Sequence, residues 1–186
     1  MRQFSNVTIV KAFLGEKMQD IRVNLEQIGA NTTIIESEKG NKMISLVTLD
    51  EVMSEKRFEN SVLKLLKVDA EGFDTIILRG SCNVLKKHKP VLYFEYNRSN
   101  MITINEEGIS TILSFIDLGY NKIIFFDRMG ALLLSTSVKD QKIITYLHNY
   151  ISSKKNLLGY LDICIFHEDD DSSADSFFLE EQRQIM

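Results

Sequence analysis

The stretch that decides the fold is residues 65–74, with the sequence LLKVDAEGFD. It closes an apolar run over 62–68 that is too continuous for a half-exposed strand, so the run predicts an interior strand of a parallel sheet. The acidic residues Asp69 and Glu71 follow directly. Apolar residues at helical spacing then predict a helix that ends before Pro90, the only proline in the chain. The stretch therefore predicts a strand, an acidic turn and a helix in succession.

The residues after this helix continue the alternation of strands and helices. The predicted elements are strands over 91–94, 122–126, 131–135 and 160–166 and helices over 105–118 and 139–151. The turn DRMG at 127–130 predicts a hairpin, and Thr103 and Glu106 have the spacing of a capping box at a helix start. Buried strands that alternate with helices predict a three-layer α/β sandwich with a mostly parallel sheet and right-handed crossovers.

The first third of the chain is predicted to be rich in strands. An apolar run covers 7–13, candidate strands cover 21–26, 32–35 and 43–49, and a short helix covers 49–56. The alternation of apolar and polar residues at 21–26 is typical of a strand with one wet face. Strands with short connections predict an antiparallel meander here.

Composition indicates one domain with an acidic tail. The chain has 186 residues and a net charge of −4, and its last 19 residues, 168–186, hold seven acidic side chains and one basic. The sequence therefore predicts a domain over 1–167 and a disordered tail over 168–186. The near-neutral domain gives no sign of nucleic-acid binding, and its apolar runs are too short to span a bilayer.

Cysteine and glycine usage exclude several kinds of site. Cys82 and Cys164 form no disulfide framework, and the chain contains no CxxC or HExxH metal motif, so we expect a cytoplasmic protein without a metal site of those types. No two of the nine glycines lie closer than eight residues. The chain as given therefore has no glycine-rich loop for a phosphate or dinucleotide, and a nucleotide-like cofactor must be held in another way.

The candidate site lies where two predicted strands end. Asp69 and Glu71 follow the first strand, and Glu95 follows the next, so neighbouring parallel strands would bring the three acids to one pocket. Two carboxylates about 4 Å apart repel by about 4 kcal/mol at an effective dielectric constant of 20. A shared proton would turn one of them into a general base, whereas a bound cation would make them ligands for magnesium, and the sequence leaves both open. Acids after a strand also cap helices, which is the alternative role for Glu71 and Asp74.

The block from residue 65 to Glu95 resembles the core of the FkbM family of S-adenosylmethionine-dependent methyltransferases. The shared features are an apolar strand, K-V-D-A-E-G at 67–72, an acid at Asp74, L-x-G at 78–80 and a strand that ends in Glu95. The segment VTLDE at 47–51 is similar to the family's sequence just upstream. The resemblance covers about residues 5–166, and Asp74 stands where the family usually has Glu.

The resemblance implies a Rossmann-like methyltransferase fold that transfers a methyl group from S-adenosylmethionine to an oxygen, often a hydroxyl of a sugar or natural product. Asp69 and Glu71 would line the site of transfer, with Glu95 across from them. The family's first two βα units, which carry a D-x-G-x-N-x-G loop and a ribose-binding acid, would precede residue 1. We therefore expect a domain that lacks these units and their cofactor contacts.

Three hypotheses follow. The first is an O-methyltransferase that acts on a small-molecule or glycan acceptor with Asp69, Glu71 or Glu95 as the base. The second is a non-catalytic remnant or subunit that associates with itself or a partner chain through an exposed strand edge. The third is a magnesium-dependent acid cluster that acts on a phosphorylated or sugar substrate.

Overall fold

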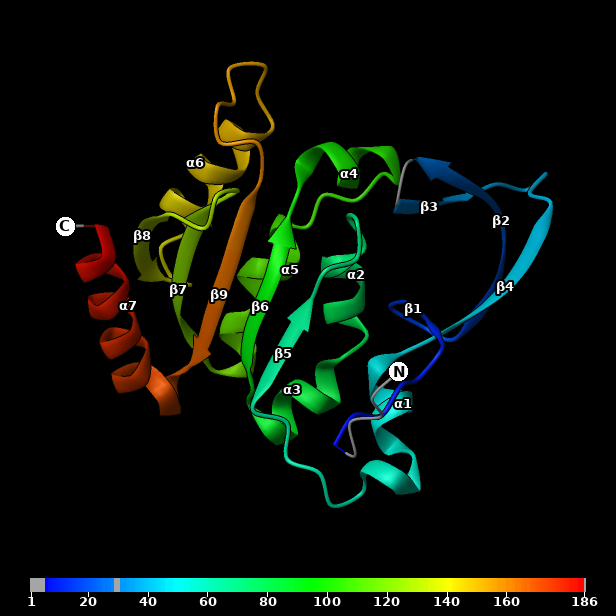
Figure 1. The fold of residues 1–186 in the computed structure, drawn as a ribbon, viewed down its shortest axis with the longest axis horizontal. Coiled ribbons are helices and arrows are strands. Elements are labelled where there is room, and N and C mark those ends of the chain that lie inside the picture. Colours follow the sequence, from blue (N-terminus) through cyan, green and yellow to red (C-terminus); the bar gives the residue numbers. More distant parts are fainter. Residues whose placement is uncertain (1–5, 29–30, 186) are drawn as a thin grey trace.

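The larger of two β-sheets organises the structure (Figure 1). A computed structural model describes residues 6–28 and 31–185. The strands of this sheet lie in the order β5 (Leu65–Val68), β6 (Val91–Tyr96), β9 (Leu161–His167), β7 (Tyr120–Asp127) and β8 (Leu132–Ser137). β5 and β6 are parallel, and the other three neighbouring pairs are antiparallel. The expectation of a mostly parallel sheet is therefore wrong, because β8 returns from the predicted hairpin and β9 runs back between β6 and β7.

β5 lies at the edge of this sheet and not in its interior. The strand begins at Leu65, three residues later than predicted. Leu65 is 56% exposed, whereas Val68 is 6% exposed and packs in the core. The apolar run at 62–68 predicted a strand buried on both faces. Only the side chains that face the helices, such as Val68, are buried.

Helices pack against both faces of the larger sheet, which makes the fold mixed α/β. The helices on the first face are α2 (Asp74–Arg79), α3 (Cys82–His88), α4 (Arg98–Thr103), α5 (Ile109–Ser114) and α6 (Gln141–Ile151). They bury the main core with alternate residues of the strands, such as Leu92, Phe94 and Tyr96 of β6. The predicted helix after the acidic turn is two helices, and the one predicted over 105–118 is α5 followed by a 3-10 turn over Phe115–Leu118.

The predicted disordered tail is wrong for most of its length. Glu168–Asp170 form a 3-10 turn, and Asp171–Ile185 form the helix α7, which packs on the second face of the sheet. Ala174 is 1% exposed in that contact. The acidic residues do not prevent folding because Asp171 accepts a hydrogen bond from Asn121 and Asp175 pairs with Lys122, both on β7. Composition alone missed these pairings.

A smaller sheet stands beside the β5 edge (Figure 1). Its strands lie in the order β1 (Phe13–Leu14), β4 (Lys42–Val47), β2 (Gln19–Ile28) and β3 (Asn31–Glu36). The predicted meander is confirmed for β2, β3 and β4, which pair antiparallel, while β1 is parallel to β4. Of the apolar run at 7–13, only Phe13 belongs to a strand. Ile21, Val23 and Ile44 form this sheet's own small core.

Two features of the sequence join the small sheet to the larger one. A Cβ atom at Gly80, between α2 and α3, would overlap the carbonyl oxygen of Gly15, so only glycine permits this approach. Asp50 belongs to α1 (Leu49–Ser54), and its carboxylate accepts hydrogen bonds from the backbone N–H groups of Asn83 at 3.0 Å and Val84 at 2.8 Å. The backbone N–H of Asp50 also donates to the carbonyl oxygen of Gly80 at 3.2 Å, so the VTLDE and L-x-G segments lie against each other. A 3-10 turn over Lys56–Phe58 follows α1.

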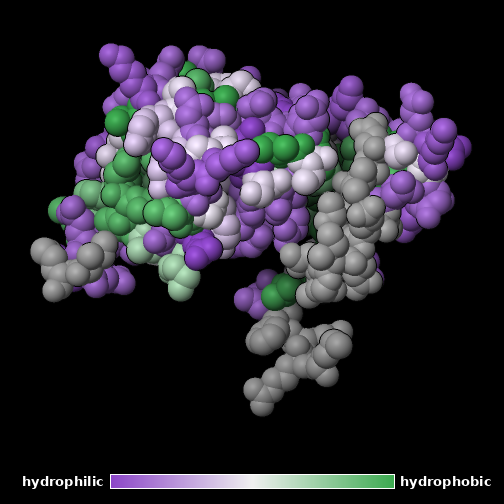
Figure 2. Space-filling view, turned by 90° about the horizontal axis from the view of Figure 1, so that it is seen from above, coloured by the Kyte–Doolittle hydropathy of each residue, from purple (hydrophilic) through white to green (hydrophobic). Residues whose placement is uncertain are grey.

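Within residues 6–28 and 31–185, no helix has the length and apolar character that crossing a membrane requires. The surface seen from the end at which β5 and β6 finish is largely hydrophilic, with an apolar patch toward the side of α6 and β8 (Figure 2).

Candidate functional site

The turn after β5 is held in an unusual backbone conformation. Glu71 has φ 50° and Gly72 has φ 97°, both in the left-handed region. The buried carboxylate of Asp74 accepts hydrogen bonds from the backbone N–H groups of Ala70 and Gly72, each at 3.2 Å. A Cβ atom at Gly72 would lie 2.9 Å from the backbone carbon of Asn100, so glycine is needed for space as well as for φ. Asp74 thus holds the backbone of the turn that precedes α2. The alternative that Asp74 caps this helix is wrong, because the N-cap residue is Phe73 and makes no side-chain capping hydrogen bond.

A row of three carboxylates crosses the end of the larger sheet. The register pairs Val68 of β5 with Phe94 of β6, so Asp69 and Glu95, the next residues on each strand, are neighbours. Glu95 in turn pairs with Asp162 of β9. Because neighbouring strands lie about 4.8 Å apart and the three residues share one face of the sheet, their side chains project side by side. The structure therefore brings together the predicted residues Asp69 and Glu95 and adds Asp162.

The environment of Glu95 favours its protonated form. Burial raises the pKa of Glu95 to about 7, with smaller contributions from the negative charges of Asp74, Asp69 and Glu71, while a hydrogen bond with Asn97 opposes the rise. Burial likewise raises the pKa of Asp74 to about 6, against hydrogen bonds from the backbone. A carboxyl group that titrates near neutral pH is suited to take up and release a proton.

Asp69 and Asp162, the other members of the row, have polar partners, and so does Glu71 of the acidic turn. Asp69 forms an ion pair with Lys67 at 2.6 Å on the surface, and Glu71 accepts a hydrogen bond from Asn100 at 2.8 Å. Burial raises the pKa of Asp162, whereas its hydrogen bond with Tyr93 lowers it. Burial also raises the pKa of Tyr93 to about 12, and Asp162 adds to that rise.

Sequence reasoning did not identify Asp162, Tyr93 or Asn100 as members of the site. Asn100 lies in the first turn of α4, where Asn97 caps the helix by accepting hydrogen bonds from the N–H groups of Ser99 and Asn100. The available signal for Asp162 was an acid inside an otherwise apolar predicted strand at 160–166. The sequence does not show that β9 lies beside β6, and without this pairing Asp162 could not be assigned to the site.

An apolar cavity of about 370 Å³ opens beside the acidic turn. On the side of the turn it is lined by Asp69, Ala70, Glu71, Phe73 and Ile77, and on the side of the small sheet by Ala12, Phe13, Leu14, Ile21 and Leu46. A second cavity of about 350 Å³, lined in part by Lys17, Arg79 and Asn105, shares Ile21, Leu46 and Phe73 with the first. Two of the three predicted acids, Asp69 and Glu71, thus lie on the wall of a cavity of the size that small ligands occupy.

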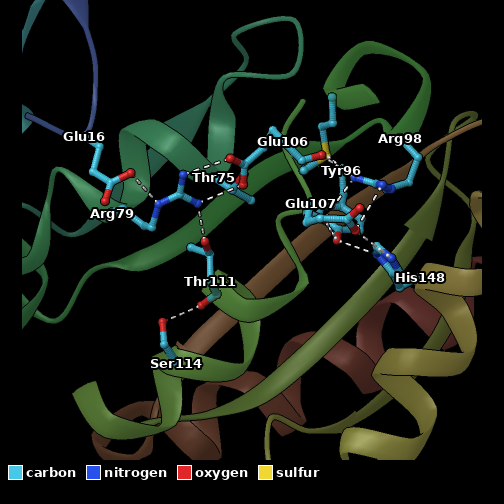
Figure 3. Close-up of polar contacts among 11 residues, drawn as sticks. Glu16, Thr75, Arg79, Tyr96, Arg98, Glu106, Glu107, Thr111, Ser114 and His148 are labelled. Atoms are coloured by element: carbon cyan, nitrogen blue, oxygen red, sulfur yellow. Dashed lines mark hydrogen bonds and ion pairs between the residues drawn. The ribbon is translucent and has the colours of Figure 1, made fainter. Parts of the chain in front are cut away.

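A second polar cluster lies among α2, α4, α5 and α6, and in it both arginines have acidic partners (Figure 3). Arg79 contacts both carboxylate oxygens of Glu106, at 2.8 and 2.9 Å, and also pairs with Glu16. Burial acts to raise the pKa of Glu106, but hydrogen bonds from Arg79 and Thr75 and the charge of Arg79 lower it overall. The predicted capping box is therefore wrong, because Glu106 binds Arg79 and α5 begins only at Ile109.

The second arginine of this cluster, Arg98, is 4% exposed. It donates hydrogen bonds to the backbone carbonyl oxygens of Glu106 at 2.7 Å and Glu107 at 3.0 Å and to Ser152 Oγ at 3.0 Å. Tyr96 Oη lies 2.9 Å from His148 Nδ1 in the same network. These contacts tie α4 to α6 and serve the fold, since the cations and their oxygen partners satisfy one another.

Among the residues that the structure describes, no group of three or more His, Cys, Asp or Glu side chains is arranged to hold a metal ion.

The fold and the strand-end acids define the class: an α/β domain whose candidate site lies at the carboxyl end of a parallel strand pair, beside an apolar cavity. Residues 13–122 match the family model described as the methyltransferase FkbM domain. This match covers more than half of the 186 residues, and the chain therefore belongs to the FkbM methyltransferase family. Searches of curated proteins and of solved structures gave no match.

Proposed function

We propose that this protein transfers a methyl group from S-adenosylmethionine to a hydroxyl oxygen of a small-molecule or glycan acceptor. The observation that carries the proposal is that Asp69 and Glu95 both follow the last paired residues of β5 and β6, Val68 and Phe94, in a domain of the FkbM methyltransferase family. Membership of that family also supports a Rossmann-like arrangement of the domain. The acceptor class follows from the family's usual chemistry and from the carboxylates, which accept hydrogen bonds from hydroxyl groups.

The cavity beside the acidic turn suits the adenosyl part of the methyl donor. Phe13 and Phe73 offer aromatic surface to a purine ring, and the carboxylates of Asp69 and Glu71 are acceptors for ribose hydroxyls and favour a nearby positive charge. When bound, S-adenosylmethionine supplies a methyl group on a positively charged sulfur. Phe13, Phe73, Asp69 and Glu71 are the residues that would hold it.

Glu95 is the residue that would act as the general base. As a carboxylate it accepts the proton of the acceptor hydroxyl, and its pKa of about 7 makes that uptake favourable near neutral pH. Asn97 orients Glu95, while Asn100 orients Glu71 at the cavity wall. Most of the acceleration would come from holding the hydroxyl in line with the methyl group between these side chains.

A thermal-shift experiment followed by an activity assay tests the proposal. S-adenosylmethionine and S-adenosylhomocysteine at millimolar concentration should raise the melting temperature of the folded protein. Release of S-adenosylhomocysteine should then be measured with a panel of sugars and phenols as acceptors. Asp69→Asn should weaken the shift, whereas Asp117→Asn, an exposed acid in the 3-10 turn after α5, should not. A folded sample that shows neither a shift nor product would contradict the proposal.

A further inference from the structure

Two connections meet at the end of the larger sheet where the carboxylate row lies: the turn between β7 and β8 and the loop between α6 and β9 (Figure 1). Asp127, the last residue of β7, pairs with Leu161, the first residue of β9. The next residues outward, Arg128 and Tyr160, therefore stand opposite each other beyond the ends of these strands. Tyr160 is two residues from Asp162, a member of the row. The connections thus bring a cation and an aromatic ring to the side of the row that is remote from β5.

The Arg128 side chain lies against the neighbouring loop and is exposed to solvent. A Cβ atom at Gly159 would lie 2.9 Å from Cδ of Arg128, and Gly159 has φ 80°, so glycine permits this close contact. The carboxylate of Asp127 is occupied, because it accepts hydrogen bonds from the N–H groups of Met129 at 2.8 Å and Ala131 at 2.9 Å. Among the residues that the structure describes, none forms an ion pair or a hydrogen bond with the Arg128 side chain. Its guanidinium group therefore keeps the capacity for a bidentate contact with an anion.

Tyr160 lies within electrostatic reach of both Arg128 and the carboxylate row. Partial burial raises the pKa of Tyr160, the charges of the row add to the rise, and the charge of Arg128 lowers it. The side chain of Tyr160 is partly exposed, and in the described part of the chain its hydroxyl group has no hydrogen-bond partner. Such a tyrosine offers an aromatic face to the apolar face of a sugar ring and a hydroxyl group to its oxygen atoms.

The spacing of these groups suits an acceptor with an anionic group at one end and a hydroxyl group at the other. Because β9 lies between β6 and β7, the strands that precede Arg128 and carry Glu95 are about 10 Å apart, twice the distance between neighbouring strands. One sugar ring together with an ion pair covers such a distance. The methyl donor, in the cavity walled by Asp69 and Glu71, would lie on the opposite side of Glu95 and would leave Arg128 to the acceptor.

The negative charge of the row favours a carboxylate over a phosphate as the anionic group. A phosphate monoester carries nearly two negative charges at neutral pH, whereas a carboxylate carries one. Repulsion by the neighbouring acids is therefore smaller for the carboxylate.

We propose that Arg128 and Tyr160 bind the acceptor and that the acceptor is a sugar acid. Its carboxylate contacts Arg128, its ring lies on Tyr160, and one of its hydroxyl groups faces Glu95. This assignment rests on the proposed function for the reaction that follows binding.

Binding of sugar probes in the absence of a methyl donor tests the assignment. The probes are the methyl glycosides of glucuronic and galacturonic acid, the neutral methyl glucoside and methyl galactoside, and glucose 6-phosphate. NMR titrations follow the probes and the Nε–H signal of Arg128. Arg128→Met removes the cation, and Arg22→Met, which replaces an exposed arginine of β2, is the matched control. The thermal shift with S-adenosylhomocysteine is measured on the same proteins.

We expect the wild type and Arg22→Met to bind at least one acidic glycoside at least tenfold more tightly than its neutral counterpart. Arg128→Met should lose this preference, and Tyr160→Ala should weaken the binding of acidic and neutral glycosides alike. Equal binding of the two kinds of glycoside by the wild type, binding of neither, or a preference that survives Arg128→Met would overturn the proposal.

The remaining outcomes separate this site from the methyl donor site. Tighter binding of glucose 6-phosphate than of both acidic glycosides would overturn the choice of a sugar acid. A thermal shift with S-adenosylhomocysteine that Arg128→Met abolishes would assign Arg128 to the methyl donor and would overturn the proposal as well. Selective binding of an acidic glycoside by a wild type that shows no thermal shift would support the sugar acid site and contradict the proposed function.

Discussion

The arginine cluster and the carboxylate row contain the same kind of acidic side chain but use it in opposite ways. Glu106 lies against Arg79, and its pKa is lowered overall despite burial. Glu95 lies among other acids, and burial together with their charges raises its pKa to about 7. A buried carboxylate that is matched by a cation stabilises the fold, whereas one that is surrounded by acids is available for proton transfer. The two clusters therefore separate the residues that hold this domain from those that would act on a ligand.

The largest expected effect is on activity, from a change in the carboxylate row. Glu95→Gln keeps the shape of the side chain and removes the proton acceptor, so methyl transfer to the best acceptor should fall by about 10²- to 10⁴-fold. The melting temperature should stay the same or rise, because a half-buried negative charge is removed. Rates of S-adenosylhomocysteine release and thermal melts measure the two effects. A variant that is fully active, or one that loses activity only because it unfolds, would contradict a role of the carboxylate row in proton transfer.

The arginine cluster should show the reverse response, with loss of stability. Arg79→Met leaves Glu106 partly buried without its cation, and the free energy of unfolding should fall by about 3 kcal/mol. Lys86→Met, on the exposed side of α3, is the control and should change stability by less than about 0.5 kcal/mol. Urea unfolding measures both. If Arg79→Met were as stable as Lys86→Met, the arginine cluster would not be what holds this region together.

A smaller effect should come from the backbone of the acidic turn. Gly72→Ala must adopt a positive φ and also meets the backbone of Asn100, so it should lower the free energy of unfolding by about 1–3 kcal/mol. Gly130→Ala has a similar φ of 79° but nothing within 4 Å of its Cβ, so it isolates the cost of the backbone conformation. The difference between the two variants in urea unfolding measures the close approach to α4. If both variants lost the same free energy of unfolding, the close approach of Gly72 to Asn100 would not contribute to the cost.

The pH dependence of stability tests the carboxylate row without any substitution. The folded state holds the Glu95 proton more tightly than the unfolded state, because its pKa rises from 4.5 to about 7. The free energy of unfolding should therefore fall as pH rises from about 4.5 to about 7, and Asp74 adds to the decline from about pH 4 to 6. Glu95→Gln should flatten the upper part of this decline in urea titrations at fixed salt. A free energy of unfolding that increases over the same pH range in the wild type would contradict the raised pKa of Glu95.

Local patterns in the sequence predicted most of the elements around the site. The strand before Asp69, the turn at Gly72 and the strand ending near Glu95 follow from apolar runs and from turn chemistry, and all three are present. The family resemblance is confirmed by the match over 13–122.

Features that depend on contacts distant in sequence were not predictable in this way. Asp162 joins the carboxylate row only because β9 pairs with β6, and α7 lies on the sheet through the buried Ala174 and through polar contacts of Asp171 and Asp175 with β7. The helix predicted over 105–118 begins later than expected for a similar reason. Glu106 binds Arg79, which lies 27 residues away in the chain, and does not form part of a helix start.

The most direct measurement of the central claim is the pKa of Glu95, followed by NMR with carboxyl-labelled glutamate in the wild type and in Asp69→Asn. If the ends of β5 and β6 bring their acids together, Glu95 should titrate at about 7 in the wild type and at a lower pH once the neighbouring charge is removed. A Glu95 that titrates at 4.5, the ordinary value for glutamate, and does not respond to Asp69→Asn would show that the two acids do not share a site.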